Sequence, residues 1–253
     1  MANGSILRYI GLLVIFFVLV TAAPPSHSAS KKEETKPGKA VKLPEEVIGW
    51  RLIYKHHLIG MMQVDISPIG GKVMTGFMNA CIHGTTDKDS TVFVFNPDSK
   101  TYYVFTPDSF KTKMSRIYKS HRPPDWHREL KNVGSAESIL GHVTQLSIYS
   151  LVSTVHPEIR YPDKIWSDPS IPTPGQMKHF VATMMNCPDG IPGVPLRMSR
   201  TMKLNPLVTE DYLEVTSIEK RKFKAADFEP PLNYKRTTDD SQLVDFGTLP
   251  LAH

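Results

Sequence analysis

The sequence of 253 residues lacks the short motifs that mark the commonest catalytic sites. It contains no G-x-S-x-G nucleophile elbow, no G-x-x-x-x-G-K-[ST] phosphate-binding loop and no H-E-x-x-H zinc motif. Its ten histidines form no H-x-H pair, and Cys81 with His83 lacks the C-x-x-C spacing of a zinc site. We therefore expect no metal and no cofactor, and the sequence offers no positive reason to infer an enzyme.

Most of the chain also lacks an excess of positive charge. The formal net charge is +5, but six of the 30 Lys and Arg residues and two of the 25 acidic residues lie before residue 45. The rest of the chain holds 24 basic and 23 acidic residues, a net charge of +1. Because nucleic-acid binding requires a basic surface, this balance argues against a nucleic-acid partner.

Only one long apolar run is present, and it lies at the N-terminus. Arg8 is followed by 12 apolar residues, 9–20, then by small residues and the Pro24-Pro25 break. A membrane span needs ~20 apolar residues, whereas a positive start, a short apolar core and small residues are typical of a secretory signal peptide. We predict a signal peptide over residues 1–30, cleaved near residues 28–30. An uncleaved membrane anchor is the alternative.

The absence of a cysteine just after this run excludes a lipid-modified N-terminus there. The absence of a second run predicts no transmembrane span after cleavage, and hence an exported protein, periplasmic or extracellular. Residues 31–44 are small and charged, as in a flexible basic linker. Residues 45–236 are expected to form a single β-rich domain, and residues 237–253 a C-terminal tail.

Within the domain, apolar and polar residues alternate in short stretches. The 21 prolines disfavour long helices. Residues 92–95 and 101–105 flank an Asn-Pro-Asp-Ser-Lys loop and predict a hairpin. Other predicted strands are 50–56, 61–67, 142–155, 163–166, 194–203 and 211–219. This spacing favours a mainly β (α+β) fold, an antiparallel sandwich or barrel.

Helices are expected to be few. Residues 174–186 predict a helix with one apolar face, because apolar side chains recur at helical spacing: Met177, Val181, Met184 and Met185, with Phe180 beside them. Residues 107–119 are ambiguous between helix and loop. Gly70-Gly71 is interpreted as a turn.

The two cysteines, Cys81 and Cys187, are a candidate disulfide because an exported chain with an even cysteine count favours pairing. A bond between them would close a loop of over 100 residues. In the chain-entropy model, closing such a loop stabilises the fold by ~4–5 kcal/mol. Two buried thiols are the alternative.

Several motifs of the second half occur in a recognisable order. They are SILGHV at 138–143, KIWSD at 164–168, DGIPGVPLRM at 189–198 and VTSIE at 215–219, with FEPPLNY at 228–234. This order resembles a family of exported bacterial proteins of unknown function that is similar to the lipoprotein-carrier (Lol-type) superfamily. The resemblance covers about residues 135–236, with weaker support from 50–105, and the chain departs from it in its two cysteines and a Pro-rich insert near 156–174.

The resemblance implies a curved antiparallel sheet or incomplete barrel, with a few short helices on its open side. It also implies a concave apolar face that can hold lipid chains or other hydrophobic partners. If a ligand cavity exists, its walls should be the apolar residues of one sheet face and of the covering helix. These are Trp50, Leu52, Tyr54, Val64, Ile66, Tyr103, Phe105, Met177, Phe180, Val181 and Met184. A closed core built by the same residues is the competing interpretation.

The favoured function is therefore an exported, non-enzymatic protein that binds a hydrophobic small molecule or lipid. The alternative is a cell-envelope interaction module that holds another protein by a sheet edge or by the Pro-rich loop. An enzyme of unrecognised type would need convergent polar groups in a pocket, which the sequence does not indicate.

Export predicts a processed N-terminus. N-terminal sequencing of the exported protein should begin between Ala29 and Lys31, because the small residues after the apolar run suit signal peptidase. An intact Met1 on the exported species would contradict the signal peptide.

Overall fold

The computed structural model describes residues 46–239, except 58, 77, 85, 87–88, 121–125 and 202–208. The predicted signal peptide, the linker and residues 240–253 of the predicted tail lie outside the described residues. None of the helices in this part of the chain is long and apolar enough to cross a membrane.

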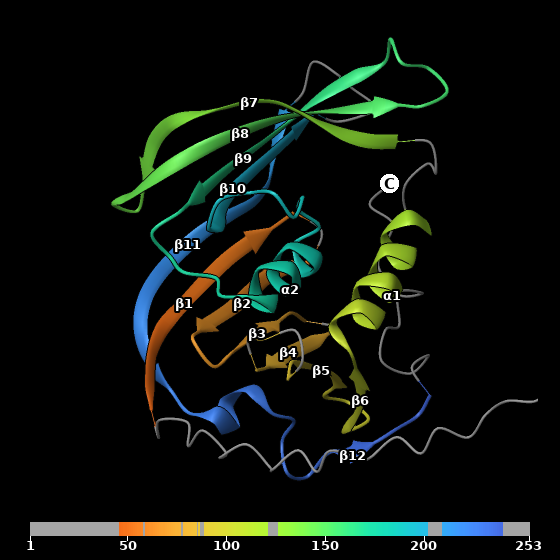
Figure 1. Cartoon of the computed structure of the whole chain (residues 1–253), viewed down its shortest axis with the longest axis vertical. Coiled ribbons are helices and arrows are strands. Elements are labelled where there is room, and N and C mark those ends of the chain that lie inside the picture. The colour runs from red at the N-terminus through yellow and green to blue at the C-terminus, as the bar shows by residue number, and fades with distance from the viewer. Residues whose placement is uncertain are drawn as a thin grey trace, which may run out of the picture. The chain divides into compact units, whose positions relative to one another are not determined.

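A single sheet of twelve strands dominates the described part of the chain (Figure 1). Its strands are β1 (Val47–His56), β2 (Gly60–Ser67), β3 (Gly70–Met74), β4 (Asn79–His83), β5 (Thr91–Asn96), β6 (Thr101–Phe105), β7 (Trp126–Ile139), β8 (His142–Ser153), β9 (Arg160–Asp168), β10 (Val194–Thr201), β11 (Thr209–Phe223) and β12 (Lys235–Arg236). The spatial order is β12-β6-β5-β4-β3-β2-β1-β11-β10-β9-β8-β7. Neighbours are antiparallel except β12, which runs parallel to β6. The end strands β12 and β7 do not pair with each other, so the sheet is curved but unclosed, and the mainly β fold predicted from the sequence is confirmed.

Two helices, α1 (Pro107–Ser120) and α2 (Gln176–Met184), lie on the concave side of this sheet (Figure 1). Thr106 caps α1, since its hydroxyl oxygen accepts the Ser109 N–H at 3.2 Å, and Pro107 suits the first helical position. The ambiguous segment 107–119 is therefore helical. The predicted helix within 174–186 is present as α2. We call the helix-covered side of the sheet the inner face and the opposite side the outer face.

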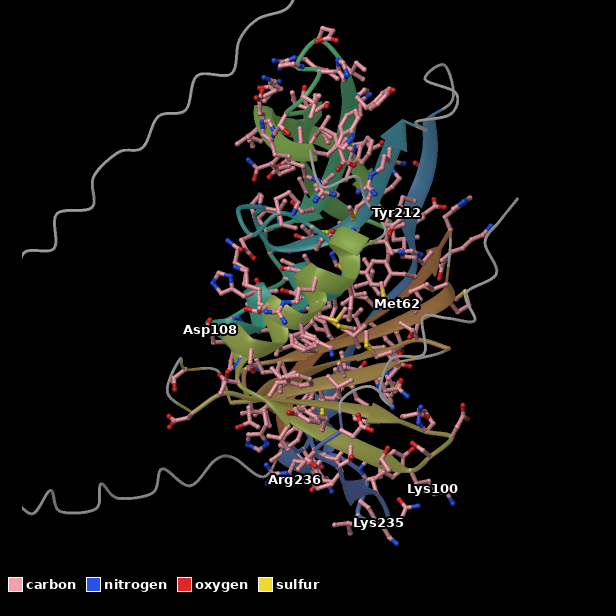
Figure 2. The ribbon with its side chains drawn as sticks, turned by 90° about the vertical axis from the view of Figure 1, so that its right-hand side faces the viewer. Met62, Lys100, Asp108, Tyr212, Lys235 and Arg236 are labelled. Atoms are coloured by element: carbon pink, nitrogen blue, oxygen red, sulfur yellow. The ribbon has the colours of Figure 1, made fainter. Side chains whose placement is uncertain are left out.

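The C-terminal part of the described chain crosses the outer face. After β11, the short 3₁₀ helix η1 (Ala225–Phe228) places the fully buried Phe228 over β3. The chain then reaches the far edge of the sheet, where Lys235 donates its backbone N–H to the Lys100 carbonyl at 2.9 Å. Figure 2 marks Lys100 and Lys235 at this edge. This crossing covers one of the two sheet edges, which would otherwise expose unpaired backbone groups.

The interpretation of Gly70-Gly71 as a turn is wrong. Both glycines lie within β3, opposite His83 and Ile82 of β4. A Cβ on Gly70 would meet the Ile82 carbonyl oxygen and the Phe228 ring, each at 2.7 Å. A Cβ on Gly71 would overlap Met177 of α2 on the other face. Glycine is needed here because both faces of the strand are approached closely, not because the backbone turns.

The sequence analysis did not predict strand β7, because most of its side chains are exposed and they show no alternation of apolar and polar residues. It forms the other edge of the sheet and carries two bulges in its pairing with β8, at Leu130/Asn132 and Ser135/Ser138. Bulges of this kind are common on edge strands, where they strengthen the local twist.

The close packing at Gly70 predicts a steric cost for a single methyl group. Gly70→Ala should lower the free energy of unfolding by ~1–3 kcal/mol, because the backbone of β4 and the Phe228 ring must both shift. Gly134→Ala is the matched control, since a Cβ at this β7 position meets no atom within 4 Å. Urea denaturation of the two variants measures the difference, and an equal stability of both would contradict the packing described.

Candidate functional site

All eleven residues that the sequence analysis named as ligand-lining lie on the inner face or on the helix α2 that covers it. Nine belong to one buried apolar cluster: Leu52, Tyr54, Val64, Ile66, Phe105, Met177, Phe180, Val181 and Met184. Trp50 and Tyr103 are partly buried and pack against that cluster. The named residues are thus brought together, in an arrangement that also suits a closed core.

Strand register explains why these residues meet. Leu52 of β1 lies opposite Val64 of β2, and Tyr54 lies opposite Met62. Because side chains alternate between the faces of a sheet, the even-numbered positions of both strands all point inward. Trp50 continues this row to its margin, where its ring meets the His142 ring at 5.7 Å between centroids and the Lys220 ammonium lies 5.0 Å from the ring centre.

Methionine is concentrated between the sheet and the helices. Seven of the 11 methionines in the chain belong to the inner cluster: Met62, Met78, Met114, Met177, Met184, Met185 and Met198. They come from the sheet, from the connection between β3 and β4, from α1, and from α2 and the residue after it. An unbranched thioether side chain adapts to a changed neighbour more readily than a branched one. The contact between helices and sheet therefore includes several side chains that can repack.

A pocket of about 120 Å³ opens between α1 and α2. Phe110 and Phe180 line it, with their ring centroids 5.7 Å apart. Lys111 also lines this pocket, and its ammonium lies 2.7 Å from a carboxylate oxygen of Asp189. This ion pair ties α1 to the segment after α2. The pocket between the two helices is thus lined by aromatic side chains together with polar and charged ones.

Charged residues occupy one end of the inner face. The carboxylate of Asp163, on β9, is fully buried and accepts a hydrogen bond of 2.7 Å from Arg128 Nε of β7. Arg200 of β10 donates two longer bonds to the same carboxylate, both of 3.3 Å. Burial alone would raise the pKa of Asp163, but the charges of Arg200 and Arg128 outweigh it and hold that pKa below its usual value. We call Arg128, Asp163 and Arg200 the inner-face charge cluster.

Aromatic rings surround this cluster on the side of β1 and β11. The Arg200 guanidinium lies 4.7 Å from the centre of the Tyr212 ring, which also meets the His56 ring at 4.4 Å. Tyr212 packs against the apolar inner cluster and is marked in Figure 2 together with Met62. Burial, with smaller contributions from His57 and Arg200, lowers the pKa of His56 to about 4, so this ring is neutral at pH 7.

The sequence analysis did not identify the charge cluster. A weak signal was present, because Asp163 and Arg200 each lie two residues from an apolar inward position, at Ile165 and Met198. In a strand, that spacing places a side chain on the same face. The sequence did not reveal that strands far apart in the chain bring the three charges together.

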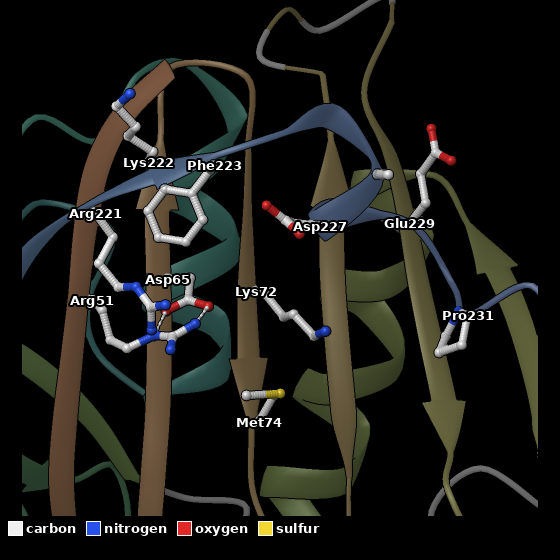
Figure 3. Close-up of a pocket in the computed structure, with 11 residues that line it drawn as sticks. Arg51, Asp65, Lys72, Met74, Arg221, Lys222, Phe223, Asp227, Glu229 and Pro231 are labelled. Atoms are coloured by element: carbon white, nitrogen blue, oxygen red, sulfur yellow. Dashed lines mark hydrogen bonds and ion pairs between the residues drawn. The ribbon is translucent and has the colours of Figure 1, made fainter. Parts of the chain in front are cut away.

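A second pocket, of about 280 Å³, lies on the outer face below η1 (Figure 3). At its wall, Arg51 holds Asp65 through two hydrogen bonds of 2.7 and 2.8 Å. That hydrogen-bonded pair raises the pKa of Arg51. Lys72 and Asp227 also line this pocket, so it carries charges of both signs.

The disulfide expected between Cys81 and Cys187 is absent, although both residues lie in the described part of the chain. Cys81 lies between Ala80 and Ile82, which both point into the inner cluster, so its own side chain points to the outer face. Cys187 packs on the inner face, with its Sγ 3.2 Å from the sulfur of Met198. The sheet therefore separates the two thiols. Burial raises the pKa of the Cys81 thiol to about 12.

No group of three or more metal-binding side chains occurs among the residues that the structure describes.

Comparison with known proteins gives structural matches only. No protein-family model matches the sequence, and no curated protein matches it. Among solved structures, an outer membrane lipoprotein-sorting protein domain from Vibrio parahaemolyticus is 10% identical, with a TM-score of 0.24, over 70% of this chain and 85% of its own. A LolA superfamily protein from Nitrosomonas europaea is 13% identical, with a TM-score of 0.24, over 74% of this chain and 91% of its own.

The buried neutral His56 predicts a loss of stability in acid. Between its unfolded pKa of 6.5 and its folded pKa of about 4, only the unfolded chain takes up the proton. Lowering the pH from 7 to 4.5 should therefore remove about 2 kcal/mol of the free energy of unfolding through this group. His56→Gln should lack this contribution, whereas His156→Gln, at a histidine whose side chain is 63% exposed, should retain it. Urea denaturation at the two pH values tests this, and equal acid sensitivity of both variants would contradict it.

Proposed function

We propose that this chain is an exported, non-catalytic protein that binds a hydrophobic or lipid ligand between the inner face of its sheet and helices α1 and α2. The observation that carries the proposal is the methionine-rich apolar cluster that spans the contact between sheet and helices. A rigid core needs only close packing, whereas a surface that admits ligands of variable shape benefits from side chains that repack.

Because the sheet is unclosed, such a ligand can reach the inner face between the helices and the sheet. A closed barrel would fix the volume of its interior, but here the concave face is covered by two helices that pack on it through apolar side chains, such as Met114 of α1 and Met177 of α2. Apolar packing is non-directional, so an acyl chain can take the place of a helix side chain as the helices move outward. Each methylene of that chain buried between helices and sheet would contribute about 0.8 kcal/mol, which offsets the weaker packing of the helices on the sheet.

A cell-envelope interaction module is the second candidate, and strand β7 is the observation that favours it. β7 is a 14-residue strand at the edge of the sheet, and among the described residues only β8 pairs with it. Leu130 and Val133 are exposed on it. An extended segment of another protein can add to such an edge through backbone hydrogen bonds. The two bulges of β7 oppose this, because they interrupt its regular pairing.

Enlarging a side chain at the contact between α2 and the sheet distinguishes a ligand-binding surface from a closed core. If the helices yield to ligands, Val181→Trp should leave the fold nearly intact and abolish binding of a fluorescent fatty-acid probe, because the indole fills the ligand's space. If the core is closed, the same change should cost ~1–3 kcal/mol of stability through overpacking. Val143→Trp is the control, since Val143 on β8 is 75% exposed.

Probe titration and thermal unfolding of the full-length chain give both readouts. Native mass spectrometry of the exported protein adds a third, because a bound amphiphile that survives purification would show as added mass. A wild type that neither binds the probe nor retains a lipid, together with an unstable Val181→Trp, would reject ligand binding and leave the interaction module.

A further inference from the structure

The charge cluster at the end of the inner face is not explained by apolar ligand binding alone. We propose that Arg128 and Arg200 form a subsite for the anionic headgroup, a carboxylate or a phosphate, of an amphiphile whose chain lies on the apolar inner face. This inference rests on the proposed function and specifies the chemical class of its ligand.

The charge cluster is continuous with the apolar surface. Asp163 lies opposite Tyr149 of β8 and opposite Arg200 of β10 in the strand pairing. Tyr149 belongs to the apolar cluster, as do Ile165 and Met198, the inward neighbours of the two charged residues on their strands. An amphiphile lying along these strands would therefore pass from apolar to charged surroundings without leaving the inner face.

The cluster has an excess of one positive charge. Two guanidiniums, which stay protonated at any physiological pH, share the single carboxylate of Asp163. His56 beside them is neutral at pH 7. Among the described residues, no other carboxylate forms an ion pair with either arginine. A charge held away from water is costly unless it is paired, and a ligand anion would supply the missing partner.

One donor of this cluster is left without an acceptor. Arg128 gives its Nε to Asp163, but its Nη2 is buried and has no hydrogen-bond partner. Buried donors are nearly always satisfied, and an unsatisfied one indicates a missing partner. The Arg200 guanidinium is held against the Tyr212 ring, which fixes its plane. An oxyanion between the two arginines would accept charge-assisted hydrogen bonds from both, and such bonds are the strongest available to a protein.

Arg197 on the same strand provides a matched control. Its side chain is 20% exposed, against 21% for Arg200, and it too contacts one carboxylate and lies over one aromatic ring, those of Glu137 and Trp166. Its Nε is likewise buried without a partner. However, Arg197 lies between the inward-pointing Leu196 and Met198, so it points to the outer face, and its charge is matched one to one.

Three ligands with the same 12-carbon chain test the inference: dodecanoate, dodecyl phosphate and the neutral dodecanol. The two anions are used below their critical micelle concentrations and the alcohol below its solubility limit. Their dissociation constants for the full-length chain are measured by calorimetry. At least one anion should bind roughly tenfold or more tightly than the alcohol, as expected of charge-assisted hydrogen bonds in a site shielded from water. A preference for the carboxylate would indicate fatty acids, and a preference for the phosphate would indicate phospholipid-like ligands.

Arg200→Met and Arg128→Met should each reduce this preference to about equal affinity while leaving dodecanol binding unchanged. Arg197→Met should keep the preference. Two variants are used so that one remains informative if the other does not fold, as judged by circular dichroism. Equal binding of the anions and the alcohol by the wild type, or loss of the preference in Arg197→Met as well, would overturn the headgroup subsite and leave the proposed function intact. Failure of all three ligands to bind would reject the proposed function itself.

Discussion

The arrangement of this chain depends on one constraint: an apolar sheet face that the sheet itself does not close. β12 and β7 remain the two ends of the strand order, so the inner face must be covered by other elements. Helices α1 and α2 provide the cover, and Phe110, Met114 and Met177 are buried where they pack. The apolar inner cluster thus exists because an open sheet must bury one face against something.

The same constraint makes the two faces of the sheet chemically different. The inner face is apolar until it reaches the charges of Asp163 and Arg200. The outer face carries ion pairs such as Arg51–Asp65, and η1 crosses it to bury Phe228. This division also keeps Cys81 and Cys187 apart. Wherever the strands alternate regularly, neighbouring residues belong to different environments, and sequence proximity says little about contact.

Ligand binding and a stable core are closely related in such a fold. Side chains that bury the inner face in the unliganded protein are the ones that would touch a ligand. Methionine at these positions reconciles the two demands, because it fills space well without imposing one shape. The charge cluster differs, since a net charge inside a protein lowers stability unless another group balances it. Its position at the end of an apolar surface suits an amphiphile, which has one apolar and one charged part.

The sequence by itself determined the mainly β class, the inward row from Trp50 to Tyr54, the facing row on β2 and the apolar face of α2, because these follow from side-chain periods of two and 3.6 residues. It did not determine β3, where Gly70 and Gly71 indicate close contacts made by Phe228 and Met177 from distant parts of the chain. Nor did it determine that Cys81 and Cys187 lie on opposite faces, or that Arg128, Asp163 and Arg200 meet. Those features depend on which strands pair and in what register, and only the tertiary structure decides that, because period-two alternation is equally compatible with many partners.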